Sequence, residues 1–252
     1  MRDLSGRRVA LFVPCYVDQL APDVGFATLE VLRRVGIEAE FSRDQTCCGQ
    51  PMANMGFQRE AAPLVAHFGR VFEGFDYVVC PSGSCTAMVR HAYAGFGDAV
   101  ATAAGARTFE LCEFLVDVAG VTSVRGHFPH RVGFHRSCHA LRGLRLGSCS
   151  ERVEPALDPV GDLLSGIDGL ELVELSRPDE CCGFGGGFCV DEAGVSAMMG
   201  RDRIRDHRDA GAEIIASSDM SCLLHLDGLL RREGGAQRVM HVAEILAGCE
   251  PF

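Results

Sequence analysis

The residues of this chain best suited to chemistry are cysteines, and the first group centres on the pair Cys47-Cys48, which is followed by Gly49. Thirty-one residues separate this pair from Cys15 upstream, and 36 separate it from Cys85 downstream. Thiolates brought together from three chain segments form a soft-metal or iron–sulfur site. The glycine lets the backbone turn tightly and offer its N–H groups to such a site. The first half of the chain therefore predicts a four-thiolate centre.

The second half repeats this arrangement around Cys181-Cys182-Gly183. Forty-two residues separate the second pair from Cys138, and 39 separate it from Cys222. The offsets between corresponding cysteines are 123, 134, 134 and 137 residues, which indicates an internal duplication. The expected ligands are Cys15, Cys47, Cys48 and Cys85 in the first repeat and Cys138, Cys181, Cys182 and Cys222 in the second.

Short apolar runs that are typical of buried strands lead into the outer cysteines of both repeats. These runs are Val9–Val13, Tyr77–Cys80, Val132–Phe134 and Ile214–Ser217. Helical periodicity follows at Phe26–Val35, Phe57–Phe72, Leu111–Val118 and Val195–His207. The alternation predicts an α/β protein with two pseudo-symmetric repeats, each a small, mostly parallel sheet with flanking helices. We expect the repeats to span residues 1–125 and 126–252, to form one compact unit, and to hold their ligands beyond the carboxyl ends of the strands.

The composition excludes several classes of protein. The 252 residues carry a net charge of −10, which argues against a nucleic-acid partner. No stretch approaches the roughly 20 apolar residues of a transmembrane segment. The apolar run Val9–Val13 is too short for a signal peptide and is interrupted by Pro14. We therefore expect a cytoplasmic protein, in which the 13 cysteines stay reduced and serve metal or redox chemistry.

Zinc is the chemical alternative to an iron–sulfur cluster, because four thiolates also suit zinc. Structural zinc sites usually take ligands from short CxxC motifs, and the sequence contains none. The long spacings here require a folded scaffold to bring the thiolates together, which favours a cluster over zinc.

Three further residues near the strand ends are candidate ligands. Cys80 ends a strand five residues before Cys85, and its role is open between a core residue and a spare ligand. Ser82 and Asp219 each stand three residues before the last cysteine of their repeat. Either residue can supply an oxygen ligand or cap the following helix, and we favour the cap.

Two histidines bracket Cys138. His135 and His139 are candidates to bind a metal, donate to a cluster sulfide or carry a proton coupled to electron transfer. The alternative for each is a partly exposed histidine at a strand end, which we favour slightly. Nearby, Arg136 and Arg142 would hold a small carboxylate or balance cluster charge, or remain solvated.

On these residues the whole chain resembles the cysteine-rich (CCG) domain proteins, which include the iron–sulfur subunit of glycolate oxidase and the B-type subunit of heterodisulfide reductase. The resemblance rests on Cys15…Cys47-Cys48-Gly49…Pro81-Ser82-Gly83-Ser84-Cys85 and on His135…Cys138-His139…Cys181-Cys182-Gly183-Phe184-Gly185-Gly186…Asp219…Cys222. The length of the chain and the absence of a fused ferredoxin module favour the lactate-utilization branch of the family.

The resemblance implies an iron–sulfur electron-transfer subunit of an oxidoreductase system that converts L-lactate to pyruvate. The implied cofactors are two iron–sulfur clusters, with 4Fe-4S favoured, and the implied partners are an iron–sulfur B-type protein and a C-type protein. Heterodisulfide reductase subunits end each repeat in CxxC, whereas this chain has Ser82-x-x-Cys85 and Asp219-x-x-Cys222. That difference favours four thiolates per repeat over a five-cysteine cluster.

Three alternative functions remain open at the level of the sequence. The chain could be a thiol or heterodisulfide-type reductase, a subunit of another 2-hydroxy-acid oxidase, or a zinc-stabilised interaction module. No GxGxxG motif lies between a predicted strand and helix, so we expect the hydride chemistry of lactate oxidation on another subunit.

Overall fold

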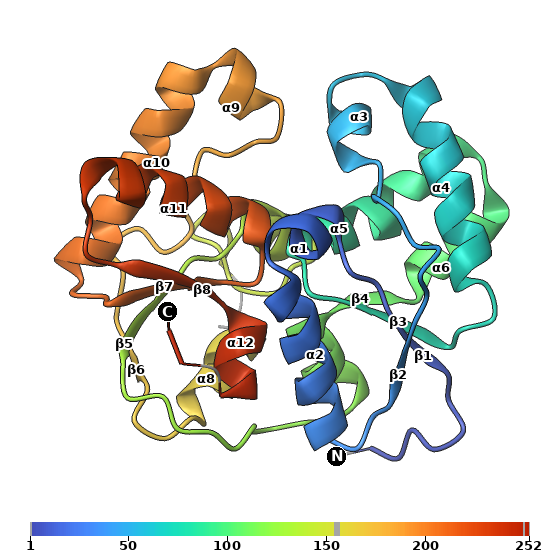
Figure 1. The fold of residues 1–252 in the computed structure, drawn as a ribbon, viewed down its shortest axis with the longest axis horizontal. Helices are drawn as coiled ribbons and strands as arrows, with labels where there is room; N and C mark the ends of the chain where they lie inside the picture. Colours follow the sequence, from blue (N-terminus) through green and yellow to red (C-terminus); the bar gives the residue numbers. More distant parts are fainter. Residues whose placement is uncertain (1, 154–156, 249, 252) are drawn as a thin grey trace. The chain divides into compact units, whose positions relative to one another are not determined.

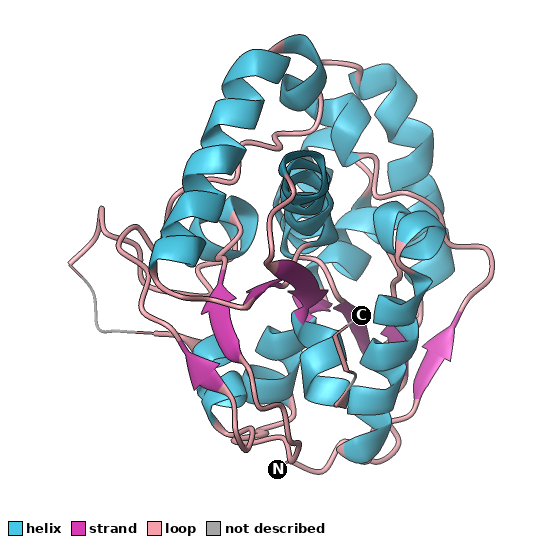
Figure 2. Cartoon of the chain, turned by 60° about the vertical axis from the view of Figure 1, so that its left-hand side comes forward, coloured by secondary structure: helices cyan, strands magenta, loops and turns pink. Residues whose placement is uncertain are grey.

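The structure is a computed structural model that describes residues 2–153, 157–248 and 250–251. The chain divides into two compact units, residues 1–121 and residues 122–252. Each unit contains one four-stranded sheet in which all strands are parallel (Figures 1 and 2).

The first unit has the strand order β2-β1-β3-β4. Its strands are β1 (Val9–Leu11), β2 (Ala39–Phe41), β3 (Tyr77–Cys80) and β4 (Thr108–Glu110). Its helices are α1 (Cys15–Leu20), α2 (Pro22–Arg34), α3 (Gln50–Asn54), α4 (Gln58–Phe72), α5 (Gly83–Ala87), the π-helix η1 (Met88–Ala92), the 3-10 helix η2 (Tyr93–Phe96), α6 (Ala99–Ala106), α7 (Leu111–Glu113) and the π-helix η3 (Phe114–Val118).

The second unit repeats this topology in the order β6-β5-β7-β8. Its strands are β5 (Arg131–Phe134), β6 (Glu171–Leu172), β7 (Ile214–Ser217) and β8 (Arg238–His241). Its helices are the π-helix η4 (His139–Gly143), α8 (Pro159–Ser165), α9 (Phe188–Asp191), α10 (Ala193–Asp209), α11 (Met220–Glu233) and α12 (Val242–Ala247). The predicted fold class, an α/β protein of two parallel-sheet repeats, is confirmed.

The order of the strands creates a topological switch point in each sheet. In the first unit the chain moves from β1 outward to β2 and then returns to place β3 on the other side of β1. The second unit does the same with β5, β6 and β7. Segments that leave two neighbouring strands in opposite directions open a crevice at their carboxyl ends, and ligands of such sheets bind there.

The central strands are buried because their residues are continuously apolar. Val9, Ala10 and Leu11 of β1 are at most 2% exposed, as are Val78 and Val79 of β3. Strands covered by helices on both faces have this composition, which is why short runs of the sequence predict them. Among the described residues we find no helix with the length and apolar character needed to cross a lipid bilayer.

Candidate metal centres

The predicted ligands of the first unit converge on its switch point. Cys15 is the first residue of α1, four residues after β1, and Cys85 lies in α5 directly after β3. The Cys47-Cys48 pair comes from the loop between β2 and α3. Parallel strands bring their carboxyl ends to the same edge of a sheet, so segments remote in sequence meet there.

The four thiols of the first unit are linked in a row. The Sγ atoms of Cys15 and Cys47 are 3.6 Å apart, and those of Cys48 and Cys85 are 3.4 Å apart. The side chains of Cys47 and Cys48 also interact by a hydrogen bond. Cys48 and Cys85 are buried, while Cys15 and Cys47 are half-buried. The centre thus has an inner and an outer pair of thiols.

The second unit reproduces the row of thiols. Cys138 is hydrogen-bonded to Cys181, Cys181 to Cys182, and Cys182 to Cys222. Cys182 and Cys222 are buried, whereas Cys138 and Cys181 are half-buried. The structure therefore brings all eight predicted cysteines together as two groups of four. Their role as ligands stays a prediction.

One thiol in each group is set apart by its acidity. Hydrogen bonds from Cys15 and Cys48 lower the pKa of Cys47 to about 3, and the corresponding bonds from Cys138 and Cys182 lower the pKa of Cys181 to about 2. The pKa of Cys15 is raised in turn, chiefly by its hydrogen bond to Cys47. The thiolate is the form of cysteine that binds metals. The hydrogen bonds therefore favour the thiolate form of one half-buried sulfur in each group.

The glycine after each cysteine pair donates a backbone hydrogen bond to the acidic sulfur. The N–H of Gly49 donates to Cys47 Sγ at 3.4 Å, and the N–H of Gly183 donates to Cys181 Sγ at 3.3 Å. Both glycines have a left-handed backbone, with φ of 80° and 87°. A side chain is disfavoured there, so glycine is what permits the N–H to point at the sulfur.

Both oxygen-bearing candidates are helix N-caps. Ser82 Oγ accepts a hydrogen bond from the N–H of Cys85 at 3.3 Å at the start of α5. Asp219 accepts from the N–H of Ser221 at the start of α11, which carries Cys222. Cys80 is fully buried, and its thiol donates to the carbonyl of Ser82 at 3.8 Å. These residues position the last cysteine of each group.

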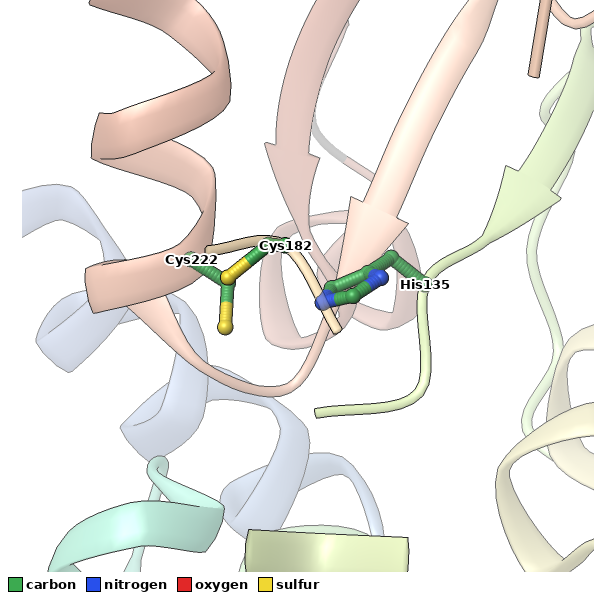
Figure 3. Close-up of side chains that lie close together, drawn as sticks. All are labelled: His135, Cys182 and Cys222. Carbon is green, nitrogen blue, oxygen red and sulfur yellow. The ribbon is translucent and has the colours of Figure 1, made fainter. Parts of the chain in front are cut away.

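The two histidines differ in position. His139 is exposed at the start of η4. His135 is 0% exposed and has a ring nitrogen within 4.8 Å of the Sγ atoms of Cys182 and Cys222, which lie within the same distance of each other (Figure 3). The expectation of a partly exposed side chain is therefore wrong for His135. The switch point of the second sheet buries it.

The two arginines near Cys138 are engaged in ion pairs. Arg136 pairs with Asp158, and Arg142 donates from Nε to Glu151 at 2.8 Å. Both guanidinium groups therefore already have a carboxylate partner from within the chain. Binding a small substrate carboxylate at either arginine would require displacing that partner.

Tyr93 is a residue near the first centre that sequence reasoning missed. Its side chain is 0% exposed, and its hydroxyl donates to the carbonyl of Cys48 at 3.0 Å. Burial, followed by the nearby thiols, raises the pKa of Tyr93. A lone tyrosine 45 residues after a cysteine carries no sequence signal, because only the fold brings the two together.

Comparison with known proteins agrees with this geometry. The cysteine-rich domain (CCG) family model matches the chain twice, over residues 9–90 and 132–227, and each match contains one of the two groups of four cysteines. The chain therefore belongs to the CCG cysteine-rich domain family.

Its curated relatives include three proteins that align over nearly the whole chain. Lactate utilization protein A of an Exiguobacterium strain is 41% identical over 245 residues, which are 94% of this chain and 96% of that protein. The protein of the same name from Geobacillus kaustophilus is 40% identical, and the alignment covers 95% of this chain and 98% of that protein. Lactate utilization protein A 2 of Bacillus cereus is 37% identical with the same coverages.

A comparison with solved structures adds little. The chain superposes on glutamate racemase isoform RacE1 from Bacillus anthracis with a TM-score of 0.35 at 9% identity, over 96% of this chain and 79% of the racemase chain. This similarity is too low to indicate a shared fold.

Proposed function

We propose that this chain is an iron–sulfur electron-transfer subunit of a system that oxidises L-lactate to pyruvate. One observation carries the proposal: the same row of four thiols, with the same inner and outer pairs, stands at the switch point of both sheets. Lactate as the substrate of the system is supported by the names of the relatives that align with the whole chain.

The donor set fits an iron–sulfur cluster in each unit. Four thiols from three segments meet without any short CxxC motif, and a backbone N–H already donates to one sulfur in each group. Hydrogen bonds to sulfur and partial burial are the means by which proteins tune the potential of such clusters. The ligands would be Cys15, Cys47, Cys48 and Cys85 in the first unit and Cys138, Cys181, Cys182 and Cys222 in the second.

The inner and outer thiol pairs have different tasks in this proposal. The buried pairs anchor the centre against the apolar core, since Cys48 and Cys85 pack within the core cluster of the first unit and Cys182 and Cys222 within that of the second. The half-buried pairs leave an accessible side through which a partner can approach. When bound, a cluster at each site supplies a one-electron store, so two sites match the two electrons that lactate releases on oxidation to pyruvate.

In this proposal, partner proteins carry out the step of lactate oxidation that this subunit does not. Removal of hydride from lactate is carried out elsewhere in the system, and we propose an iron–sulfur B-type protein and a C-type protein as the partners. The twelve cysteines that the structure describes are free thiols, which suits a reducing compartment, and we propose the cytoplasm.

Zinc is the second candidate, and one observation favours it. The Sγ–Sγ distances of 3.4 and 3.6 Å are close to the edge of about 3.8 Å that Zn–S bonds of about 2.3 Å give in a tetrahedron. A zinc-stabilised interaction module would have no redox role.

Metal analysis of the anaerobically purified protein tests the proposal. We expect iron and acid-labile sulfide for two clusters, and we expect Cys182→Ser to lose about half of both. The matched control is Cys112→Ala, because Cys112 is also fully buried but lies outside both groups of four. Unchanged iron in Cys182→Ser would contradict the ligand assignment, and a colourless protein with stoichiometric zinc would contradict the proposed function.

The link to lactate is tested separately with the partner proteins present. Adding L-lactate under anaerobic conditions should then reduce this subunit and bleach its visible absorption. Absence of bleaching in the complete system, with iron present, would contradict its place in lactate oxidation.

A further inference from the structure

The two centres differ at one position directly after the first strand of each sheet. Phe12 follows β1, and His135 follows β5; each stands three residues before the first cysteine of its group. Phe12 is fully buried and makes edge-on ring contacts with Phe68 at 5.1 Å and Phe72 at 5.5 Å between centroids. The first unit thus fills this position with an apolar ring, while the second fills it with a ring that can bind a metal.

His135 is buried without a hydrogen-bond partner. Neither Nδ1 nor Nε2 has a partner among the described residues, and the ring is 0% exposed. A buried polar group without a partner destabilises the fold. The neighbouring Cys182 and Cys222 belong to an apolar cluster with Leu226. Both ring nitrogens of His135 are therefore available to a ligand.

The ring is directed to the thiols that the unit buries most deeply. One nitrogen of His135, Cys182 Sγ and Cys222 Sγ all lie within 4.8 Å of one another, and Figure 3 shows the ring beside the two sulfurs. The three side chains come from separate segments: the end of β5, the loop before α9, and α11. In the described part of the chain, no other three histidine, cysteine or acidic side chains form such a group.

The chemistry of the side chain suits such a role, because imidazole is the commonest protein ligand of transition metals, iron and zinc among them.

A second histidine lies near the ring. His207 of α10 is fully buried, and its ring centroid lies 6.5 Å from that of His135 in an edge-on arrangement. Gly133 makes room for it, since a Cβ on this residue would lie 2.2 Å from His207 Nδ1. In the second unit, β5 therefore has a glycine at position 133, which leaves space for the His207 ring beside His135.

We propose that His135 binds the metal of the second centre through a ring nitrogen, together with Cys182 and Cys222. The two centres are then chemically different: thiolates alone bind the first, and thiolates with one imidazole bind the second. This inference rests on the proposed function in that it requires a metal centre in the second unit. It goes further by giving that centre a neutral nitrogen ligand, which adds no negative charge where a thiolate would.

Pulsed electron paramagnetic resonance of the reduced holoprotein tests the assignment. With histidine labelled by ¹⁵N, we expect a strongly coupled nitrogen at one of the two centres. His135→Phe, which copies Phe12 of the first unit, should lose this coupling and leave the first centre unchanged. His135→Cys should also lose the coupling but keep the metal, which separates a ligand role from a packing role. His207→Phe is the matched control and should keep the coupling.

The outcomes separate this inference from the proposed function. Iron clusters in the wild type without a strongly coupled nitrogen, or a coupling that persists in His135→Phe, would overturn the assignment of His135 alone. If the protein holds zinc, the proposed function fails, and cobalt(II) substitution then tests His135 by itself. In that case a hyperfine-shifted imidazole N–H proton, lost in His135→Phe, supports the assignment, and its absence from the wild type overturns it.

Discussion

Replacing Gly183 with alanine should destabilise the second unit more than the backbone conformation alone would require. Gly183 has φ of 87°, where an L-residue costs about 1–2 kcal/mol relative to glycine. A Cβ there would also lie 2.6 Å from the carbonyl oxygen of Ser196 and 2.7 Å from Met199 Cβ. Both atoms are fixed to the backbone of α10, so the helix or the loop must move, and overpacking of this kind adds about 1–3 kcal/mol. We expect a total loss of about 2–5 kcal/mol.

Gly186 provides the matched control within the same loop. Its φ is 65°, but a Cβ there would meet no atom within 4 Å. Gly186→Ala should therefore lose only the backbone contribution of about 1–2 kcal/mol. Gly49→Ala in the first unit should behave in the same way, because its nearest contact would be at 3.7 Å.

Urea unfolding of the metal-free variants, followed by far-ultraviolet circular dichroism, measures these differences. The chain has no tryptophan, so intrinsic fluorescence is a poor probe. Equal losses for Gly183→Ala and Gly186→Ala would refute the reasoning, because they would show that contact with α10 does not require the glycine. The holoprotein of Gly183→Ala should also lose metal from the second centre only.

Three further predictions concern residues that support the centres. Tyr93→Phe should lower the stability of the first unit by about 0.5–1.5 kcal/mol, because the carbonyl of Cys48 loses its hydrogen-bond donor. Urea unfolding measures this loss, and an unchanged unfolding midpoint would contradict the prediction. Asp219→Ala should cost about 0.5–2 kcal/mol by removing the N-cap of α11, and Asp219→Asn should recover most of that loss. Arg90→Met should cost about 3–5 kcal/mol, because it leaves the buried carboxylate of Glu113 unpaired, and a loss below about 1 kcal/mol would contradict this reading of the pair.

The central elements of each sheet were predictable from the sequence because they are buried on both faces. The runs Tyr77–Cys80 and Ile214–Ser217 are apolar, and the strands have the predicted bounds. The predicted helix Phe57–Phe72 begins one residue later, at Gln58. Since Cys15, Cys85, Cys138 and Cys222 follow the central strands, the convergence of these four cysteines at the carboxyl edges of the two sheets was also predictable.

The edge strands β2 and β6 were not predictable, because each pairs on one side only and is partly exposed. Glu40 and Phe41 of β2 are exposed, and β6 consists of Glu171 and Leu172 alone. Neither segment has an apolar run that would distinguish it from a loop. The hydrogen-bond pattern within a predicted helix was not predictable either. The predicted helix Leu111–Val118 consists of the short α-helix α7 followed by the π-helix η3.

The burial of His135 could not be read from the sequence. Its neighbours along the chain, Arg136 and Cys138, gave no indication that a histidine at this strand end would be enclosed. Around the ring lie His207 of α10, for which Gly133 leaves space, and Cys222 of α11. The comparison with Phe12 becomes informative only when the two sheets are seen to have the same topology.

Electron paramagnetic resonance of the reduced, anaerobically purified protein, with iron and sulfide quantified on the same sample, tests the central claim most directly. Two centres of the 4Fe-4S type predict about eight iron and about eight sulfide per chain, with signals from two distinct centres. A protein with stoichiometric zinc, no sulfide and no signal after reduction would contradict the claim that the two groups of cysteines hold iron–sulfur clusters.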